Sequence, residues 1–587
     1  MSSRRHVGPA ELEALAESLR RDLVPLERAL AAVADLEPPT ERGLSKIVRL
    51  FPRKDGRVFS KQELILGLGR FGKDLGLEPS FILDKLRGKP IRTQSGVAPV
   101  TVLTQPYPCP GRCVFCPNDL RMPKSYLSME PGAQRAAQNS FDPYSQTLSR
   151  IRALAANGHP TDKIELIVLG GTWSSYPLPY QIAFVARCLE AMNLPDDAKQ
   201  PAPPPDPTQT LPAGTEVDGA RIGRGTAYND LVGLVTAPEL AATWPELERA
   251  QRANETSRHR AVGLSLETRP DSIDEAAAIT LRRLGATKIQ LGVESTNDEI
   301  LALNQRGHTI EQTRRAFTLL RRAGFKIQAH WMPNLLGATP ATDFEDFERL
   351  FSDEALRPDE LKVYPTVLVN SAELRKHADS GAWAPYDDET LVPLLASVLE
   401  RVPRYCRVSR VIRDIPAHDV VLGTKTANLR EVAERHTHRQ GRRLVEIRSR
   451  EIKSSIPSEL ELRETRYGVS SGAEVFLELV TPGDALAGFL RLFLPSLSSY
   501  VDELGGSAII REVHVYGPVA AFGEHDPAKS QHRGVGRALV AEARARASAE
   551  GHERLAVISS VGTRTYYRGL GFEDGVLYQH SGGARDE

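Results

Sequence analysis

The sequence predicts an α/β protein: a partial parallel α/β barrel of the TIM-like type, preceded by a helical region and followed by a second α/β domain. Three observations support this. Short β-rich runs alternate with helical stretches from about residue 97 to 412, three cysteines follow the first run, and a new strand pattern with one long helix begins near residue 466. Strands that alternate with helices are typical of a parallel sheet covered by helices.

The composition is that of an ordinary globular protein. Hydrophobic residues make up 41% and charged residues 26% of the 587 residues, and 75 Lys and Arg balance 75 Asp and Glu. Any basic surface must therefore be local. No apolar run is long enough for a membrane-spanning helix, and the N-terminus lacks the apolar core of a secretory signal. Five cysteines fit a reducing cytoplasm better than a disulfide scaffold, so we expect a cytoplasmic protein with no membrane partner.

Residues 1–88 are predicted to be a helical N-terminal region. Apolar residues recur at helical spacing in 11–23 and 25–37, and again in 60–77. Ser60 stands directly before the last of these segments and is predicted to be its N-cap, because a serine hydroxyl accepts from the free N–H groups of the first turn.

Seven runs between residues 89 and 412 are predicted to be the strands of the barrel: 98–104, 164–169, 261–266, 288–293, 326–332, 361–367 and 407–412. The barrel domain is assigned to 89–395, with a basic segment at 396–455 before the C-terminal domain at 456–587. Barrels of this type bind ligands at the carboxyl ends of their strands. The residues of interest at or after the ends of the predicted strands are Cys109, Cys113, Cys116, Gly170, Gly171, Thr172, Glu267, Glu294 and His330.

The cysteines form a C-x3-C-x2-C pattern on a Pro/Gly-rich loop. Three thiolates can hold three corners of an iron–sulfur cluster and leave one iron open. A structural zinc site would need four ligands, and no fourth Cys or His stands nearby in the sequence. Three incidental thiols are the remaining alternative. Cys188 lies in an apolar helical stretch and is interpreted as a core thiol.

Two further segments differ from the rest of the chain in composition. Residues 195–222 are Pro-rich and poor in aromatic residues, which predicts a disordered insertion of unknown function. Residues 401–450 hold 13 basic against 5 acidic residues, and residues 41–100 hold 13 against 6. Such patches are either solvated faces or an RNA-binding surface.

The C-terminal 120 residues contain predicted strands at 474–480, 486–493, 508–516 and 555–559. Gln531, Gly534 and Gly536 open the long helix with the pattern Q-x-x-G-x-G, and glycines at a helix N-terminus leave backbone N–H groups open to an anion such as the coenzyme A pyrophosphate. A YYxxLGF segment begins at Tyr566. The order of these features resembles the GCN5-related N-acetyltransferases.

The cysteine pattern, with Phe115 before its last member, resembles the radical S-adenosylmethionine (SAM) superfamily. The two halves together resemble the family of Elongator catalytic subunits, which modify the wobble uridine of tRNA. The blocks that carry this likeness run from about residue 89 to 580 and include CVFCPND, SYLSMEPGAQRA, DKIELIVLGGTW, VGLSLETRPD, LKVYPTVLV, IIREVHVYG, QHRGVG and TYYRGLGF.

The resemblance implies a set of site residues. Cys109, Cys113 and Cys116 would hold a [4Fe-4S] cluster, and SAM would lie against Gly170, Gly171, Thr172, Glu267 and Glu294. Acetyl-CoA would bind Lys163, Glu512, Val513, His514, Val515, Gln531, Gly534, Val535, Gly536, Arg537 and Tyr567. Tyr566, Tyr567 and Glu512 are the expected catalytic residues, since a tyrosine can protonate a leaving thiolate and a carboxylate can serve as a base. The implied product is 5-carboxymethyluridine.

The implied partner is the anticodon stem-loop of tRNA, with no DNA partner. The basic residues in the matching blocks are Lys89, Arg92, Lys124, Arg135 and Arg152, and the helical N-terminal region is expected to contribute. Prokaryotic relatives act without accessory subunits, so a self-sufficient monomer or homodimer is expected. The cysteine-rich zinc segment of many relatives is replaced here by RRLVEIRSREI at 442–452, so no zinc is expected.

Two other functions fit parts of the sequence. The C-terminal fold also serves amine acetylation, so a protein lysine acetyltransferase with a structural radical SAM domain is one alternative. The basic patches allow a tRNA-binding scaffold without catalysis, although such a protein has no need of three thiols at this spacing.

Overall fold

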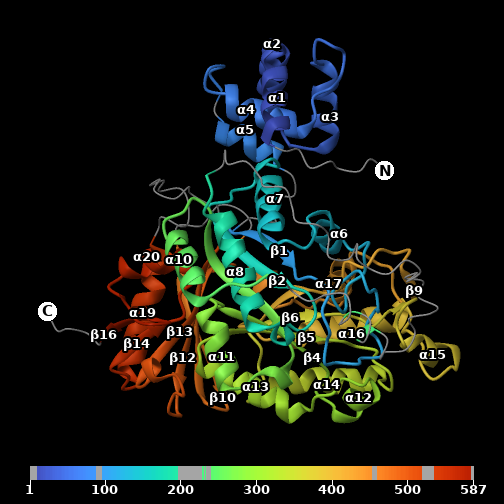
Figure 1. Cartoon of the computed structure of the whole chain (residues 1–587), viewed down its shortest axis with the longest axis vertical. Coiled ribbons are helices and arrows are strands. Elements are labelled where there is room, and N and C mark those ends of the chain that lie inside the picture. The colour runs from blue at the N-terminus through green and yellow to red at the C-terminus, as the bar shows by residue number, and fades with distance from the viewer. Residues whose placement is uncertain are drawn as a thin grey trace.

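The computed structural model describes residues 9–77, 79–87, 95–195, 228–229, 232, 240–452, 459–517 and 534–582. Three parts follow one another along the chain (Figure 1): a helical bundle that stands apart from the rest, a curved parallel sheet with helices on its outer side, and a second sheet packed beside it. In the described ranges no helix is both long and apolar enough to cross a membrane.

The N-terminal bundle has its own small core. Its helices are α1 (Pro9–Arg20), α2 (Leu23–Ala34), α3 (Glu41–Leu50), α4 (Lys61–Phe71) and α5 (Pro79–Leu86). Ser60 caps α4 as the sequence predicts, and Glu63 completes a capping box. Arg53 is buried between the helices, where its guanidinium contacts Asp22 at 2.8 Å and also Glu63. This buried, paired arginine fixes the loop between α3 and α4 against α1 and α2.

The central sheet is a parallel half-barrel, and the seven strands predicted from the sequence are confirmed. Its order is β1-β2-β3-β4-β5-β6-β8, with every neighbouring pair parallel. The strands are β1 (Ala98–Leu103), β2 (Lys163–Leu169), β3 (Arg260–Thr268), β4 (Lys288–Glu294), β5 (Lys326–Trp331), β6 (Glu360–Val363) and β8 (Arg407–Arg410). The strand β8 belongs to this sheet although it lies in the segment that the sequence assigns to an interdomain region.

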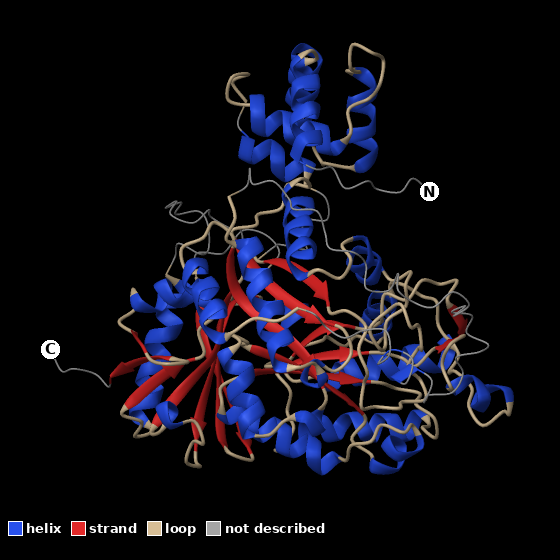
Figure 2. Cartoon of the chain, in the orientation of Figure 1, coloured by secondary structure: helices blue, strands red, loops and turns tan. Residues whose placement is uncertain are grey.

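Helices cover the outer face of the half-barrel and follow its strands in alternation (Figure 2). They are α6 (Pro131–Gln138), α7 (Pro143–Ala155), α8 (Leu178–Met192), α10 (Trp244–Asn254), α11 (Glu275–Arg283), α12 (Asp298–Leu303), α13 (Ile310–Arg322), α14 (Pro340–Ser352) and α16 (Asp388–Arg401). Smaller elements follow the last strands: β7 (Leu368–Val369), α15 (Leu374–Asp379), β9 (Val420–Leu422), α17 (Leu429–Arg439) and α18 (Ile447–Arg450).

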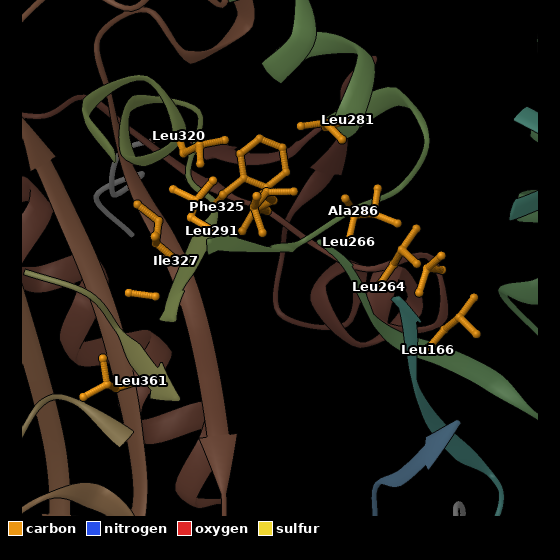
Figure 3. Close-up of a cluster of buried hydrophobic side chains, with 14 of the residues drawn as sticks. Leu166, Leu264, Leu266, Leu281, Ala286, Leu291, Leu320, Phe325, Ile327 and Leu361 are labelled. Carbon is orange, nitrogen blue, oxygen red and sulfur yellow. The ribbon is translucent and has the colours of Figure 1, made fainter. Parts of the chain in front are cut away.

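Leucine and isoleucine side chains on the outer face of the strands form the main core with these helices. Figure 3 shows Leu264, Leu291 and Ile327 from three strands meeting Leu281 of α11 and Leu320 of α13. All five are buried. Removing one such side chain typically costs about 2–5 kcal/mol. The outer face therefore stabilises the half-barrel and leaves the inner face for other purposes.

The C-terminal domain is a mixed sheet of order β10-β11-β12-β13-β14-β16-β15. Its elements are β10 (Glu461–Val469), β11 (Gly472–Val480), β12 (Leu486–Pro495), β13 (Ser507–Val515), α19 (Val535–Ala549), β14 (Arg554–Val557), α20 (Arg564–Arg568), β15 (Glu573–Asp574) and β16 (Gln579–Gly582). The strands predicted at 474–480, 486–493, 508–516 and 555–559 are confirmed. β10 lies mostly before the predicted start of the pattern at residue 466.

The two sheets are joined by buried contacts. Ile509 and Ile558 of the second domain pack against Gly324, which ends α13 in the left-handed region where a Cβ atom would lie 2.9 Å from Ile509. Ser560 donates to the Ala261 carbonyl of β3 at 2.6 Å. Side chains of both sheets belong to one continuous hydrophobic cluster. The two domains therefore act as one body around whatever lies between them.

A cavity between a cysteine loop and the C-terminal sheet

One cavity of about 2120 Å³ runs through the inside of the half-barrel and reaches the C-terminal sheet. Its wall includes Cys109, Cys113 and Cys116 from the loop after β1, and His514 and Tyr566 from the C-terminal domain. The cavity thus connects the two regions that the sequence singles out separately.

Most of the sequence-predicted site residues line this cavity. Those in its wall are Cys109, Cys113, Cys116, Lys124, Arg135, Lys163, Gly171, Thr172, Glu267, Glu294, Glu512, Val513, His514, Val515, Gly534, Gly536, Arg537, Tyr566 and Tyr567. Gly170, Arg152 and Val535 are described but are not part of the wall. Lys89, Arg92, Gln531 and residues 196–222 of the predicted insertion lie outside the described residues.

The cysteine loop is tied to the barrel by hydrogen bonds on both sides. Asn229 exchanges two hydrogen bonds with the backbone of Cys109, at 3.0 and 2.7 Å, and the hydroxyl of Thr172 lies 3.4 Å from the Cys109 sulfur. Cys113 and Cys116 are buried. Arg306 donates to the Cys113 sulfur at 3.3 Å. Contact with Cys116, and then the charge of Arg306, holds the pKa of Cys113 well below its ordinary value.

These surroundings fit an iron–sulfur cluster. Thiolates are the ligands that such clusters require, and a buried thiolate needs a cation beside it. Arg306 supplies that cation, and Arg269, which is 4% exposed, has one guanidinium nitrogen without a hydrogen-bond partner in the described chain. The described side chains do not form a ready-made group of three or more His, Cys, Asp or Glu metal ligands. The three cysteines are nevertheless the residues that would hold the cluster.

Gly170 and Gly171 form the turn after β2, and each needs to be glycine for its own reason. Both have positive φ angles, +127° and +75°. A Cβ atom on Gly170 would lie 2.0 Å from the hydroxyl of Thr104, so this glycine lets the ends of β1 and β2 approach each other. Gly171 lines the cavity. Gly171 thus presents its backbone to the cavity, whereas Gly170 packs against the end of β1.

Two carboxylates stand at the mouth of the barrel, the buried Glu294 and the partly buried Glu267. Glu294 ends β4 with a φ of +66°, a strained angle for a residue other than glycine, and its side chain lies 3.3 Å from Arg306. Burial raises the pKa of Glu294 to about 7 and also raises the pKa of Glu267. Strain and a raised pKa at the same residue are typical of a ligand-binding position.

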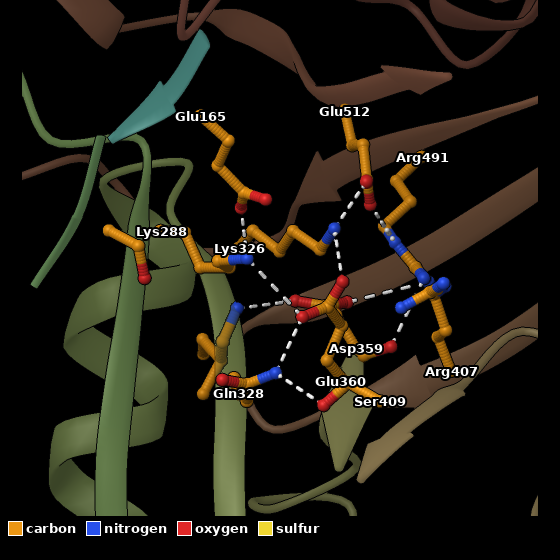
Figure 4. A network of polar contacts seen from close by, with 12 residues as sticks. Glu165, Lys288, Lys326, Gln328, Asp359, Glu360, Arg407, Ser409, Arg491 and Glu512 are labelled. Atoms are coloured by element: carbon orange, nitrogen blue, oxygen red, sulfur yellow. Dashed lines mark hydrogen bonds and ion pairs between the residues drawn. The ribbon is translucent and has the colours of Figure 1, made fainter. Parts of the chain in front are cut away.

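The inner face of the half-barrel is polar, as Figure 4 shows. Lys288 pairs with Glu165 and lies 3.4 Å from Glu360. Lys326 lies 2.7 Å from Glu360 and also pairs with Glu512 of the C-terminal sheet. Barrel interiors are usually filled by branched apolar side chains. Charged side chains here keep the interior wet and open, which explains why the cavity continues through it.

At the other end of the cavity, the pairing of β13 with β14 ends before β13 does. The strand pairs with β14 only from Ser507 to Ile510, whereas it pairs with β12 up to Val515. Among the described strands, none pairs with the backbone of 512–515 on the β14 side. Burial alone would raise the pKa of Glu512, but Lys326 and Arg491, at 2.9 Å, hold it below the ordinary value. Glu512 is thus an ionised and paired carboxylate, which makes it a weak base.

The two tyrosines of the C-terminal domain have different surroundings. Tyr566 is 41% exposed and its hydroxyl lies against Gly536 in the first turn of α19, where a Cβ atom would lie 2.7 Å away. Tyr567 is 7% exposed and packs in the domain core, and burial raises its pKa far above the ordinary value. The hydroxyl of Tyr566 is therefore the one placed at the helix N-terminus.

Of the basic residues expected to bind RNA, three lie in the described part of the chain, and they have different surroundings. Lys124 is buried, contacts Asn118 and lies 4.7 Å from the ring of Tyr228. Arg135 donates to the Pro131 carbonyl at 2.8 Å near the cavity mouth. Arg152 lies on α7, away from the wall. Lys124 is therefore placed to contact something inside the cavity rather than on the outer surface.

Sequence reasoning missed several polar residues of the cavity wall. They are Arg269, Gln290, Arg306, Lys326, Gln328, Glu360, Lys362, Tyr364, Arg410 and Arg413. The sequence pattern could have indicated six of them: Gln290, Lys326, Gln328, Glu360, Lys362 and Tyr364. Buried parallel strands usually read as near-continuous apolar runs. Here every second residue of β4, of β5 and of the segment that begins at β6 is polar, as in K-x-Q, K-x-Q-x-H and E-x-K-x-Y.

The fold and the cavity define a radical SAM protein with an acetyltransferase domain. Models of the radical SAM superfamily and of the radical SAM C-terminal domain match residues 235–351 and 358–439. The tRNA uridine(34) acetyltransferase of Dehalococcoides mccartyi is 37% identical over 82% of this chain and 96% of its own length. Human Elongator complex protein 3 is 34% identical over 84% and 85%.

A solved structure agrees with these sequence matches. The archaeal Methanocaldococcus infernus Elp3 with an N-terminal deletion superimposes with a TM-score of 0.65 at 32% identity, covering 83% of this chain and 99% of that one. The chain therefore belongs to the family of Elongator protein 3 and the tRNA uridine(34) acetyltransferases.

Proposed function

We propose that this protein modifies the wobble uridine of tRNA to 5-carboxymethyluridine, using a [4Fe-4S] cluster, SAM and acetyl-CoA. The observation that carries the proposal is the single cavity that joins the cysteine loop to the acetyltransferase sheet. Two separate enzymes would need no such connection. The names of the relatives point to the same base and the same acyl group.

The cofactors supply the difficult chemistry. When bound, the cluster and SAM would supply a radical that takes a hydrogen atom from the acetyl methyl group. The methyl carbon would bond to C5 of the uridine, the C5 hydrogen would leave as a proton, the remaining electron would return to the oxidised cluster, and hydrolysis of the thioester would release coenzyme A. Cys109, Cys113 and Cys116 hold the cluster, with Arg306 balancing its charge. Gly171, Thr172, Glu267 and Glu294 receive SAM at the same mouth, and Gly170 closes the turn behind them.

Acetyl-CoA enters from the C-terminal domain. The backbone of 512–515 pairs with its pantetheine arm, and the first turn of α19, with Gly534 to Arg537, receives its pyrophosphate. Lys163 lies at the start of β2 in the cavity wall, and burial lowers its pKa. Tyr566 protonates the departing thiolate, because its hydroxyl is the one that faces this helix end. Glu512 holds Lys326 and Arg491 in place rather than acting as a base.

The RNA reaches the mouth of the half-barrel from outside. The wobble base must leave the anticodon stack to enter, because a base cannot react inside the stack. The N-terminal bundle and the basic residues near the mouth, among them Arg135, would hold the anticodon stem-loop. The chain carries both catalytic domains, so we propose that it acts without accessory subunits.

The test is the modification reaction itself. The protein, reconstituted anaerobically with iron and sulfide, is incubated with SAM, dithionite, tRNA and methyl-deuterated acetyl-CoA, and the nucleosides are analysed by mass spectrometry. We expect deuterium both in 5-carboxymethyluridine and in 5′-deoxyadenosine. Release of coenzyme A with unmodified uridine and unlabelled 5′-deoxyadenosine would show that the two domains work separately and would overturn the proposal.

A further inference from the structure

Lys288, Lys326 and Lys362 come from the neighbouring strands β4, β5 and β6 and line the inside of the half-barrel, and Lys362 differs from the other two in having no carboxylate of the described chain within ion-pair distance. Lys288 and Lys326 each contact two glutamates. Lys362 contacts only the side-chain oxygen of Gln290, and among the described residues no carboxylate oxygen lies within 4.0 Å of its ammonium nitrogen. An ammonium group has three N–H donors. Lys362 therefore has donors left for a ligand in the cavity whose wall it forms.

The position of Lys362 is fixed by its neighbours. Gln290 donates to the hydroxyl of Ser265 at 2.8 Å, which turns the amide oxygen of Gln290 toward Lys362. His330 approaches the same oxygen at 3.4 Å. Gln290 and His330 are buried. The Gln290 amide is fixed through both its nitrogen and its oxygen, but it is neutral. It therefore orients the ammonium group of Lys362 without compensating its charge as a carboxylate would.

Lys362 stands between the two ends of the cavity. Along the same face, Glu360 lies two residues before it and belongs to the network that reaches Glu512. Tyr364 lies two residues after it, toward the mouth. A step of two residues along a strand is roughly 6.6 Å. A group at Lys362 is therefore within reach both of a thioester from the acetyltransferase side and of a base from the mouth.

Two aromatic rings complete this part of the wall. The rings of His330 and Tyr364 are 5.7 Å apart at 65°, and the Lys362 nitrogen lies 6.0 Å from the Tyr364 ring centre. Aromatic faces beside a hydrogen-bond donor are what a splayed-out base requires. The site thus combines stacking surfaces with a charged donor that suits a carbonyl oxygen.

We propose that Lys362, positioned by Gln290, binds a carbonyl oxygen of the reacting substrate, and that with His330 and Tyr364 it orients the wobble uracil through O4. This inference rests on the proposed function. The thioester carbonyl of the acetyl group offers the same chemistry from the other side, and the experiment separates the two sources.

The first test replaces Lys362 with methionine, which keeps the length of the side chain and removes the charge. A hydrogen bond to a charged group is lost, so the modification rate falls roughly tenfold to hundredfold, while tRNA affinity and iron content stay as in the wild type. Lys376→Met is the matched control, because Lys376 is an exposed lysine of α15 that does not line the cavity. If the wild type modifies tRNA and Lys362→Met does so at the same rate, the inference is wrong.

A tRNA with 4-thiouridine at the wobble position identifies the carbonyl. Sulfur is a weak hydrogen-bond acceptor, so the wild type slows on this tRNA, whereas Lys362→Met shows no further loss. That non-additive result supports the uracil oxygen. If the losses from 4-thiouridine and from Lys362→Met are additive, Lys362 binds the thioester carbonyl and not O4 of the uracil. If the wild type modifies neither tRNA, the proposed function has failed, and the result is distinct from failure at Lys362.

Amine labelling gives a readout that does not depend on turnover or on a variant. Burial lowers the pKa of Lys362 to about 8, so much of it is the reactive neutral amine at pH 8, unlike an ordinary lysine. An anticodon stem-loop with uridine at the wobble position should protect Lys362 from an amine reagent, as measured by peptide mass spectrometry. A stem-loop without a base at that position should not. Equal labelling with both stem-loops and with acetyl-CoA would overturn the inference.

Discussion

Asp359 of the half-barrel and Arg511 of the acetyltransferase sheet form an ion pair with no exposed surface on either side chain, and one of its contacts is 3.1 Å long. Arg511 stands at the irregularity in the pairing of β12 and β13, where Arg491 pairs with Glu512 and Leu492 pairs with Ile510. The extra residue turns its side chain into the barrel. A bulge in one domain thereby fixes the position of the other, and with it the path of the cavity.

Asp359→Ala should destabilise the whole chain rather than one domain. It removes one of the two carboxylates that pair with the buried Arg511, and Glu474 remains at 2.6 Å, so the cost should lie below the roughly 3–5 kcal/mol of a buried charge left without any partner. The backbone N–H of Ile327 also loses its acceptor. Urea unfolding monitored by circular dichroism should show a lower midpoint. Glu550→Ala removes the exposed pair with Arg466 and should leave the midpoint unchanged. Equal midpoints for both variants would contradict this reading of the interface.

Cys113→Ala should remove the cluster and SAM cleavage while the fold remains. Two thiolates cannot hold the cluster in the site that three cysteines provide. Bound iron, visible absorbance and 5′-deoxyadenosine formation should all be lost, with an unchanged circular dichroism spectrum. Cys188→Ala is the control, since Cys188 is buried in α8 and contacts the Pro143 carbonyl at 3.7 Å. A Cys113→Ala protein that keeps its full iron content would show that these thiols are not the ligands.

Local patterns in the sequence were enough to predict the strands and the cysteine loop. Each barrel strand is a short run with its own boundaries, and Cys109 to Cys116 are adjacent in the chain. The role of Lys362 and Gln290 was not predictable in the same way, because their contact joins β6 to β4 and requires the register of the strands between them. The pairing of Glu512 with Lys326 was unpredictable for the same reason, since the two residues are 186 positions apart in the chain.

Gly536→Ala should weaken acetyl-CoA binding and slow thioester cleavage. The added Cβ atom would lie 2.7 Å from the hydroxyl of Tyr566, so this hydroxyl must move away from the helix end where it is proposed to protonate the thiolate of coenzyme A. Loss of one hydrogen bond to acetyl-CoA corresponds to a KM for this substrate higher by about tenfold. SAM cleavage and iron content should not change. Gly582→Ala is the control, because Gly582 lies in the same domain, has no positive φ, as is true of Gly536, and has no atom within 4 Å of an added Cβ.

Lys362 should make the free energy of unfolding depend on pH. Because its charge has no acidic partner, the protein should become more stable as the pH rises from about 8 to 10.5. Burial lowers its pKa to about 8, against 10.5 for an ordinary lysine. Between these values the unfolded chain binds a proton that the folded chain does not, so stability rises with pH in this window. Below pH 8 both states are protonated and the folded state carries the full cost of the buried charge. The charged groups that influence Lys362 from each neighbouring strand are Glu267, Lys288, Glu360 and Arg410.

Lys362→Met removes this dependence. At pH 7 the variant should be more stable than the wild type, because it buries no charge, and the advantage should shrink as the pH rises from 8 toward 10.5. Urea midpoints of both proteins at pH 7, 9 and 10 measure the difference, in which the contributions of the other titrating groups cancel. The same series for Lys376→Met provides the baseline. If Lys362→Met were both less stable and less active than the wild type, Lys362 would be a structural lysine. A variant that is more stable and less active is the expected result, since a charge kept unpaired at a cost in stability is kept for the substrate.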